Sequence, residues 1–162
     1  MAKKFIYTPD DFNEFHVLKI PVLLYFVLLY LNKYFLLVVL PSIGAGDLTA
    51  IVRWFKIDAL MMMSCFPALA VLIASLYRIP TPKKFPILIW NKGLILLLIS
   101  SAMDLIVLSS YVILERRVFD LGTFVLLLIN VGIIVYLLRS KYLKQMFKEF
   151  PEELEKKWTK KE

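Results

Sequence analysis

Four long apolar stretches constrain this chain more than any other feature of its sequence. They cover residues 21–40, 59–76, 87–113 (densest at 94–113) and 121–138. A helix needs about 20 residues to cross about 30 Å of hydrocarbon, because each residue adds about 1.5 Å. None of the stretches alternates with period two, which disfavours an outer-membrane barrel. The sequence therefore predicts an all-α membrane protein with four transmembrane helices in a bundle.

The composition excludes the main soluble classes of protein. Hydrophobic residues make up 60% of the 162 residues, whereas the apolar share of a soluble domain is about 45–50%. Such a chain is too apolar to be disordered, and its single cysteine, Cys65, has no partner for a disulfide. Because there is also only one histidine, His16, we expect no metal and no cofactor.

Lys and Arg residues are distributed unevenly about the four stretches. Fifteen of the 20 lie in the amino-terminal segment, in or beside the connection between the second and third stretches, or after the fourth. Because cytoplasmic loops are enriched in Lys and Arg, we expect both termini to face the cytoplasm of a bacterial inner membrane. The net charge of +7 is then a topology signal, and we expect no nucleic-acid partner. Residues 1–150 form one predicted membrane domain, and residues 151–162 form a charged cytoplasmic tail.

Two short segments have the amphipathic pattern of helices that lie along a membrane surface. Residues 47–57 and 141–150 each place apolar side chains on one helical face and charged side chains on the other. The predicted interfacial anchors are Trp54, Trp90, Lys141, Lys144, Phe147 and Lys148. A docking surface for a partner protein is the alternative interpretation of 141–150.

Polar residues within or beside the apolar stretches are the candidates for function. They are Asn32, Lys33, Asp58, Ser100, Ser101, Asp104 and Asn130. An ionised carboxylate near the bilayer centre costs at least about 2.5–3.5 kcal/mol, so Asp104 should be protonated, paired or facing water. Lys33 is its natural partner by charge if the first and third stretches are adjacent, and Asp58 competes for the same lysine.

The Lys33 and Asp104 side chains allow two interpretations. They are either an internal ion pair that sets the register of the helices or part of a path for protons or ions. We favour the internal pair, because transport paths usually show several ionisable groups along one channel, and this sequence has one deep carboxylate and one deep amine.

Short motifs at both ends of the chain resemble a known family. They are Tyr7-Thr8-Pro9-Asp10-Asp11-Phe12 and Leu18-Lys19-Ile20-Pro21 before the first stretch, and Arg139-Ser140-Lys141-Tyr142-Leu143 and Phe147-Lys148-Glu149-Phe150-Pro151 after the fourth. Together with Trp90, they are similar to the YfeZ-like family of uncharacterised proteobacterial inner-membrane proteins. The resemblance implies location and topology, and it carries over no active site.

Three classes of function are open to such a chain. The leading class is a non-catalytic accessory or scaffold subunit that acts through protein or lipid contacts. The alternatives are a small oligomeric transporter or channel that uses Asp104 and Lys33, and a membrane enzyme acting on a lipid or quinone. The sequence contains no familiar catalytic motif, so an enzyme is the less favoured class. The expected partners are the lipid bilayer and either another protein or a second copy of the chain.

Overall fold

The described part of the chain is helical. A computed structural model describes residues 11–42, 57–78, 84–114 and 120–151. The helices in these ranges are α1 (Val22–Leu31), α2 (Lys33–Ser42), α4 (Ala59–Leu76), α5 (Lys84–Asn91), α6 (Gly93–Ile113), α7 (Leu121–Arg139) and α8 (Lys141–Met146). Apart from an isolated bridge between Phe12 and Leu18, these ranges contain no β pairing. The predicted all-α class is therefore confirmed for the described residues.

Three helices, α4, α6 and α7, are long and apolar enough to cross a membrane. The pair α1 and α2 passes the same test only when taken together, and the two helices are bent by 70° at the break between them. The chain thus has three candidate spans, or four if the bent pair is one span, which is consistent with a multi-pass membrane protein. The predicted spans 59–76 and 121–138 agree closely with α4 and α7.

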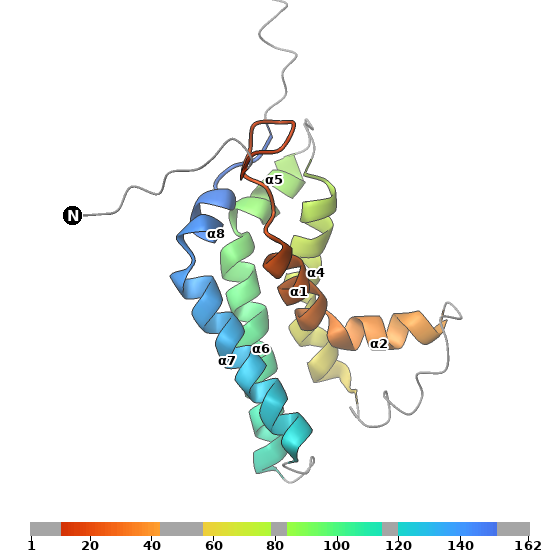
Figure 1. Cartoon of the computed structure of the whole chain (residues 1–162). Helices are drawn as coiled ribbons and strands as arrows, with labels where there is room; N and C mark the ends of the chain where they lie inside the picture. The colour runs from red at the N-terminus through yellow and green to blue at the C-terminus, as the bar shows by residue number, and fades with distance from the viewer. Residues whose placement is uncertain (1–10, 43–56, 79–83, 115–119, 152–162) are drawn as a thin grey trace, which may run out of the picture.

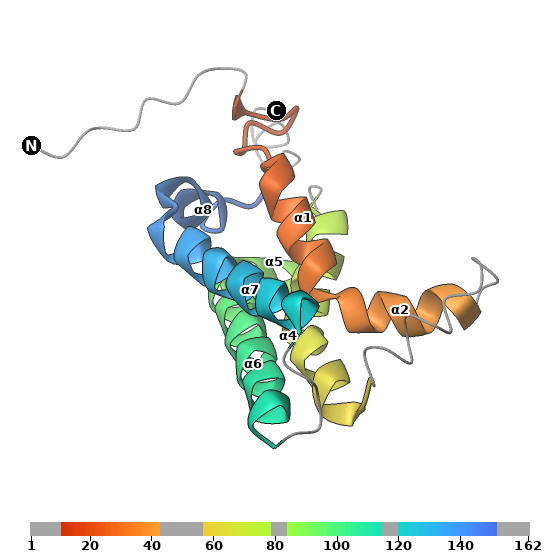
Figure 2. The ribbon, with the colours of Figure 1, turned by 60° about the horizontal axis from the view of Figure 1, so that its bottom comes forward.

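The predicted stretch 21–40 is not one continuous helix, because Asn32 divides it. The backbone of Asn32 leaves the helical range, with φ −94° and ψ 12°. Its side-chain amide donates to the carbonyl of Leu28 over 2.8 Å, so the side chain competes with the backbone for that acceptor. The chain leaves this residue in a new direction, and α2 extends away from the other helices in both views (Figures 1 and 2).

The predicted stretch 87–113 is also divided, at Lys92. This residue has φ −97° and ψ 2° and separates the short helix α5 from the long helix α6. The dense part that the sequence indicated, 94–113, lies entirely within α6. The remainder belongs to α5, which lies at the same end of the molecule as α8 (Figure 1).

Side-chain caps explain where three of the helices begin. Asp58 accepts a hydrogen bond from the Met61 amide, and Asp120 accepts one from the Thr123 amide, so that α4 and α7 each begin with a capping carboxylate. Ser140 accepts from the Leu143 amide in the same way and starts α8. Ser140 is extended, with φ −69° and ψ 106°, so it separates α7 from α8.

The long helices pack in the order expected from their connections. Helix α6 contacts both α4 and α7, and α6 and α7 lie side by side in both views (Figures 1 and 2). The connection of residues 115–119 that joins them is short, as is usual between helices that are neighbours in space.

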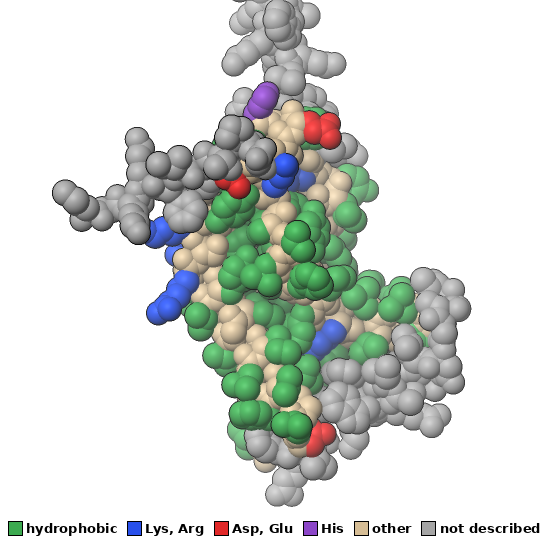
Figure 3. Space-filling model, viewed as in Figure 1, with side chains coloured by type: hydrophobic (Ala, Val, Ile, Leu, Met, Phe, Trp, Pro, Cys, Tyr) green, Lys and Arg blue, Asp and Glu red, His purple; other side chains and the backbone are tan. Residues whose placement is uncertain are grey.

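Two apolar clusters fill the space between the helices. The larger contains buried side chains from α1, α4, α5, α6, α7 and α8. The smaller lies near the bend and contains Tyr34, Met61, Cys65 and Tyr111. On the outer face shown in Figure 3, hydrophobic side chains extend along the helices, and most Lys and Arg side chains gather at the end where α8 lies.

The segment before α1 forms a tight turn rather than a helix. The side-chain oxygen of Asn13 accepts hydrogen bonds from the amides of Phe15 (3.0 Å) and Val17 (3.2 Å). His16 adopts a φ of 56°, in the left-handed region that few side chains occupy. The turn carries Leu18 into the larger apolar cluster, where its side chain is fully buried.

Candidate functional site

A cluster of polar side chains joins α1, α2, α6 and α7 near the middle of the two long helices. We call it the mid-helix cluster, and its members are Tyr30, Lys33, Ser101, Asp104 and Asn130. The five come from three apolar stretches that are far apart in the sequence, so only the folded chain brings them together. The cluster unites four of the polar residues that the sequence singled out, Lys33, Ser101, Asp104 and Asn130, and adds Tyr30.

Lys33 and Asp104 form the ion pair at the centre of this cluster. The Nζ atom of Lys33 lies 2.5 Å from Oδ2 of Asp104, and the side chains are 12% and 3% exposed. Of the two carboxylates that the sequence offered to Lys33, the structure selects Asp104, because Asp58 is engaged as the cap of α4. The pairing leaves no net charge on the two groups, which lowers the cost of burying them among apolar helices.

Asn130 connects the carboxylate to α7. Its side-chain nitrogen donates to Oδ2 of Asp104 over 2.7 Å and to the hydroxyl of Tyr30 over 3.1 Å. Its side-chain oxygen accepts from the hydroxyl of Ser101 over 3.3 Å. Both ends of the amide are therefore used, and Asn130 links polar side chains of α1, α6 and α7.

Two tyrosines enclose the ammonium group of Lys33. Its Nζ atom lies 4.2 Å from the ring centroid of Tyr30 and 4.3 Å from that of Tyr34. Aromatic faces attract a cation at this distance, and more strongly where water is excluded. The hydroxyl of Tyr30 also donates to the carbonyl of Leu126 over 2.9 Å. Sequence analysis missed both tyrosines, although Tyr30 lies three residues before Lys33, the spacing at which helical side chains are neighbours.

One oxygen of the carboxylate is available for further chemistry. Oδ1 of Asp104 is buried and has no hydrogen-bond partner among the described residues. A buried acceptor of this kind can receive a hydrogen bond from a ligand or a water molecule. The ion pair can therefore hold α2 and α6 together electrostatically. Oδ1 of Asp104 is an additional acceptor that this structural role does not use.

The other polar candidates have local roles in the structure. Asn32 makes the break in the first stretch, as described above. Ser100 donates over 2.5 Å to the carbonyl of Ser64 and so joins α6 to α4. Asp58 accepts from the Met61 amide over 3.1 Å at the start of α4. These three residues position helices and do not contact the Lys33 and Asp104 pair in the hydrogen bonds described.

A second cluster closes the end of the molecule where α5 and α8 lie. We call it the end cluster, and its members are Leu18, Arg78, Trp90, Met146, Phe147 and Glu149. They come from the turn before α1, the residues after α4, α5, α8 and the residues that follow α8. The cluster thus joins the two ends of the described chain.

Arg78 is the central cation of the end cluster. Nη1 donates to the carbonyl of Leu18 over 2.6 Å, and Nη2 donates to the carbonyl of Glu149 over 3.3 Å. The guanidinium carbon lies 4.7 Å from the ring centroid of Trp90. Burial lowers the pKa of Arg78, and the nearby Glu149 opposes that shift. From the sequence, Arg78 was predicted only to contribute to the excess of positive charge that sets the topology.

Glu149 completes the link between the two ends of the described chain. One of its carboxylate oxygens accepts from the backbone amide of Leu18 over 3.1 Å. Leu18 therefore uses both its amide and its carbonyl in this cluster, the first with Glu149 and the second with Arg78. The hydroxyl of Tyr142 adds a contact beside them, donating to the carbonyl of Lys19 over 2.8 Å.

Trp90 and Phe147, which the sequence predicted as interfacial anchors, are buried against other helices of the chain, and an anchoring role stays a prediction. Trp90 is fully buried, and its indole nitrogen donates to the carbonyl of Met146 over 3.1 Å. The rings of Trp90 and Phe147 lie 4.8 Å apart between centroids and are tilted by 45°. Gly93 allows this packing, because a Cβ atom there would lie 2.4 Å from a ring carbon of Phe147.

The remaining predicted anchors have mixed outcomes. Lys141, Lys144 and Lys148 are exposed, and their role at a membrane surface stays a prediction. The predicted helix 141–150 is shorter than expected, since α8 ends at Met146. Its apolar side chains Leu143, Met146 and Phe147 pack into the larger apolar cluster instead of facing outward. Trp54 and most of the predicted helix 47–57 lie outside the described residues, as does the tail 152–162.

Comparison with known proteins assigns a family but no activity. Residues 7–149 match the model of a family described as "Protein of unknown function (DUF2919)". No curated protein and no solved structure matches the chain. The expectation of an uncharacterised family is thereby confirmed, while the YfeZ-like name and the proteobacterial origin stay predictions.

Proposed function

The chain belongs to the DUF2919 family of proteins of unknown function, and we propose its role from its geometry alone. It is a membrane protein that acts as a non-catalytic accessory or scaffold subunit, through contacts with another protein or with lipid. Helices α4, α6 and α7 cross the membrane, and the bent pair α1 and α2 makes a fourth crossing. Both ends of the chain face the cytoplasm of a bacterial inner membrane.

The observation that carries this proposal is the direct pairing of the two charged side chains in the mid-helix cluster. Lys33 and Asp104 neutralise each other at 2.5 Å, and Asn130 joins the carboxylate to α7. Charges used in this way tie helices together. A transport path would instead leave ionisable groups spaced along a channel. The geometry therefore favours a structural role for the one charged pair that the described helices bury.

The outer surface of the helices supports a role through contacts. Only 33% of the apolar window of α4, 33% of that of α6 and 22% of that of α7 is buried within the chain. The remaining apolar area must be covered by lipid or by another protein. The concentration of Lys and Arg at the end that holds α8 (Figure 3) supports the proposed cytoplasmic location of that end.

A paired variant experiment tests the accessory role. The full-length protein is expressed at its natural level as wild type, Asp104→Asn and Asp120→Asn, and each is purified in mild detergent. Asp120→Asn makes the same chemical change at the cap of α7, where asparagine caps about as well as aspartate. We expect a stoichiometric partner to remain bound to all three, and the loss of this chain to impair assembly of that partner.

A transport activity would overturn the accessory role. The decisive result is a protein that purifies without a stoichiometric partner and conducts protons or ions across liposomes. That flux would have to be abolished by Asp104→Asn and preserved in Asp120→Asn. Retention of the fold, followed by circular dichroism, separates lost activity from unfolding.

A second candidate function, a small oligomeric transporter or channel, is favoured by one observation. The break at Asn32 lies directly beside Lys33, and the Oδ1 atom of Asp104 is buried without a described partner. Broken helices next to intramembrane charges are characteristic of substrate and ion sites in transporters. In the liposome assay, this function predicts that Lys33→Met and Asp104→Asn both abolish flux.

A further inference from the structure

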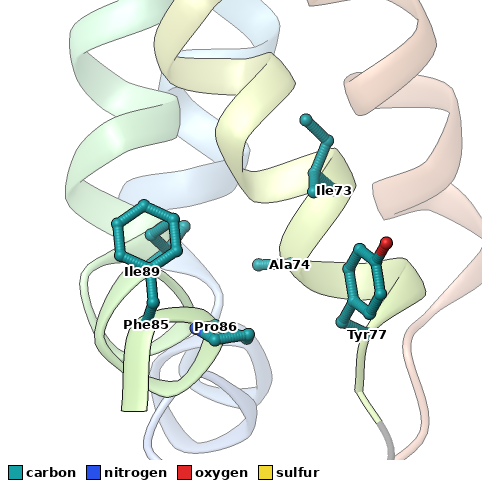
Figure 4. Close-up of a pocket in the computed structure, with 6 residues that line it drawn as sticks. All are labelled: Ile73, Ala74, Tyr77, Phe85, Pro86 and Ile89. Atoms are coloured by element: carbon teal, nitrogen blue, oxygen red, sulfur yellow. The ribbon is translucent and has the colours of Figure 1, made fainter. Parts of the chain in front are cut away.

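A hollow between the end of α4 and the start of α5 has the features of a binding site for an amphiphile. It is lined by Ile73, Ala74, Tyr77, Phe85, Pro86 and Ile89, and it holds about 210 Å³. Figure 4 shows three of these side chains projecting from α5 and three from the end of α4. The lining is apolar apart from the hydroxyl group of Tyr77, so an occupant must be apolar along most of its length.

The hollow opens on the outside of the molecule. Phe85 is 72% exposed and Tyr77 is 55% exposed, although both are large side chains in a chain with an apolar interior. Trp90 and Phe147 already close the larger apolar cluster at this end. Phe85 and Tyr77 are therefore not required to fill the described interior. An external apolar ligand is therefore the group that would bury them.

Positive charge borders the same hollow. Lys84 lines an adjoining hollow that shares Phe85, together with Ile87, Leu88 and Asn91. Lys84 and Asn91 are both exposed, and they are seven residues apart on α5, which places them on one face of the helix. An amine and an amide at this position would meet an anionic headgroup whose hydrocarbon part lies between α4 and α5.

We propose that this hollow binds one molecule of an anionic phospholipid. An acyl chain lies against Ile73, Phe85 and Ile89, and the phosphate contacts Lys84. An apolar lining with a basic rim matches a lipid better than a protein segment, because a backbone entering the hollow would find few polar partners there. The proposed site does not depend on the accessory role, since it would serve a transporter equally well.

The proposal is tested with the full-length protein in vesicles of phosphatidylglycerol and phosphatidylcholine mixed in equal parts. After mild extraction, mass spectrometry of the intact protein gives the ratio of the two lipids that remain bound. We expect phosphatidylglycerol to be enriched. Lys84→Gln should lower that enrichment about fivefold, the ratio that corresponds to about 1 kcal/mol for one lysine at a membrane surface.

Matched variants separate this site from general attraction to basic surfaces. Lys144→Gln removes another exposed lysine, on α8, and should reduce the enrichment less than Lys84→Gln. Ile73→Trp fills the hollow and should reduce the number of lipids retained, whereas Ile106→Trp, at another exposed position, should not. Unchanged binding in both Lys84→Gln and Ile73→Trp would overturn the proposal.

A cross-linking measurement identifies any other occupant. A benzophenone amino acid at Phe85 is irradiated in the same vesicles, and the product is analysed by mass. A protein–lipid adduct supports the proposal. A cross-link to a second copy of the chain or to another protein, without a lipid adduct, overturns it.

Discussion

The mid-helix cluster and the end cluster use similar groups to opposite effect. Each contains a cation, a carboxylate and an aromatic ring that faces the cation. In the mid-helix cluster, the cation of Lys33 meets the carboxylate of Asp104 directly. In the end cluster, Arg78 donates to two backbone carbonyls, and the carboxylate of Glu149 accepts from a backbone amide.

This difference determines in which cluster apolar side chains can replace the polar ones without a large loss of stability. Removing both Lys33 and Asp104 leaves neither charge unpaired, and the Asn130 amide keeps the Tyr30 hydroxyl as an acceptor, so the change can be nearly neutral. Removing the side chains of the end cluster leaves the carbonyls of Leu18 and Glu149 without their donors. Backbone groups cannot be mutated away, and burying them without partners is costly.

The largest expected effect comes from breaking the direct pair. Asp104→Leu leaves the ammonium group of Lys33 buried without its carboxylate, and it should destabilise the protein by about 3–5 kcal/mol. The double variant Lys33→Met/Asp104→Leu should recover most of this loss. The measurement is unfolding in mixed micelles of increasing denaturing detergent, followed by circular dichroism. A double variant as unstable as Asp104→Leu would contradict the comparison.

The intermediate effect belongs to the end cluster. Arg78→Leu removes two hydrogen bonds from a charged donor, and we expect a loss of about 2–3 kcal/mol in the same unfolding assay. Here the double variant Arg78→Leu/Glu149→Leu should recover nothing, because the orphaned acceptors belong to the backbone. Recovery comparable to that of the mid-helix pair would show that the two clusters are energetically alike.

The smallest effect tests whether the two clusters are energetically independent. Trp90→Phe keeps the ring packing on Phe147 but loses the hydrogen bond to the carbonyl of Met146, at a cost of about 1 kcal/mol. Combined with Arg78→Leu it should be non-additive, because the two side chains touch. Combined with Tyr30→Phe it should be additive within about 0.5 kcal/mol, and a larger deviation would mean that the clusters are coupled.

The length of each apolar stretch predicted the bounds of a helix well where the helix is continuous and poorly where it is broken. Residues 59–76 and 121–138 agree with α4 and α7 because their ends carry capping aspartates and no break intervenes. The breaks at Asn32 and Lys92 lie inside runs that remain apolar on average. A hydropathy window averages over one polar residue, whereas the backbone geometry depends on that residue alone.

The candidate site was predictable in its charges and not in its surroundings. Charge and depth indicated Asp104 as the natural partner of Lys33, because a buried carboxylate needs a nearby cation, but they left Asp58 as a competitor. The enclosure of Lys33 by two tyrosines and the burial of Trp90 depend on which helices meet, which periodicity does not specify. Trp90 was predicted at the membrane interface because tryptophan is common there, but the same side chain also fills large core positions when its nitrogen finds an acceptor.

The sequence separation of the central ion pair has a consequence for how the protein is made. Lys33 leaves the ribosome 71 residues before Asp104, which is about 4 to 14 s at synthesis rates of about 5–20 residues per second. During that interval Lys33 has no Asp104 carboxylate to meet. The contacts that hold the first segment, Lys33 with Asp104 and Leu18 with Glu149, can therefore form only after α6 and then the residues after α8 have been synthesised.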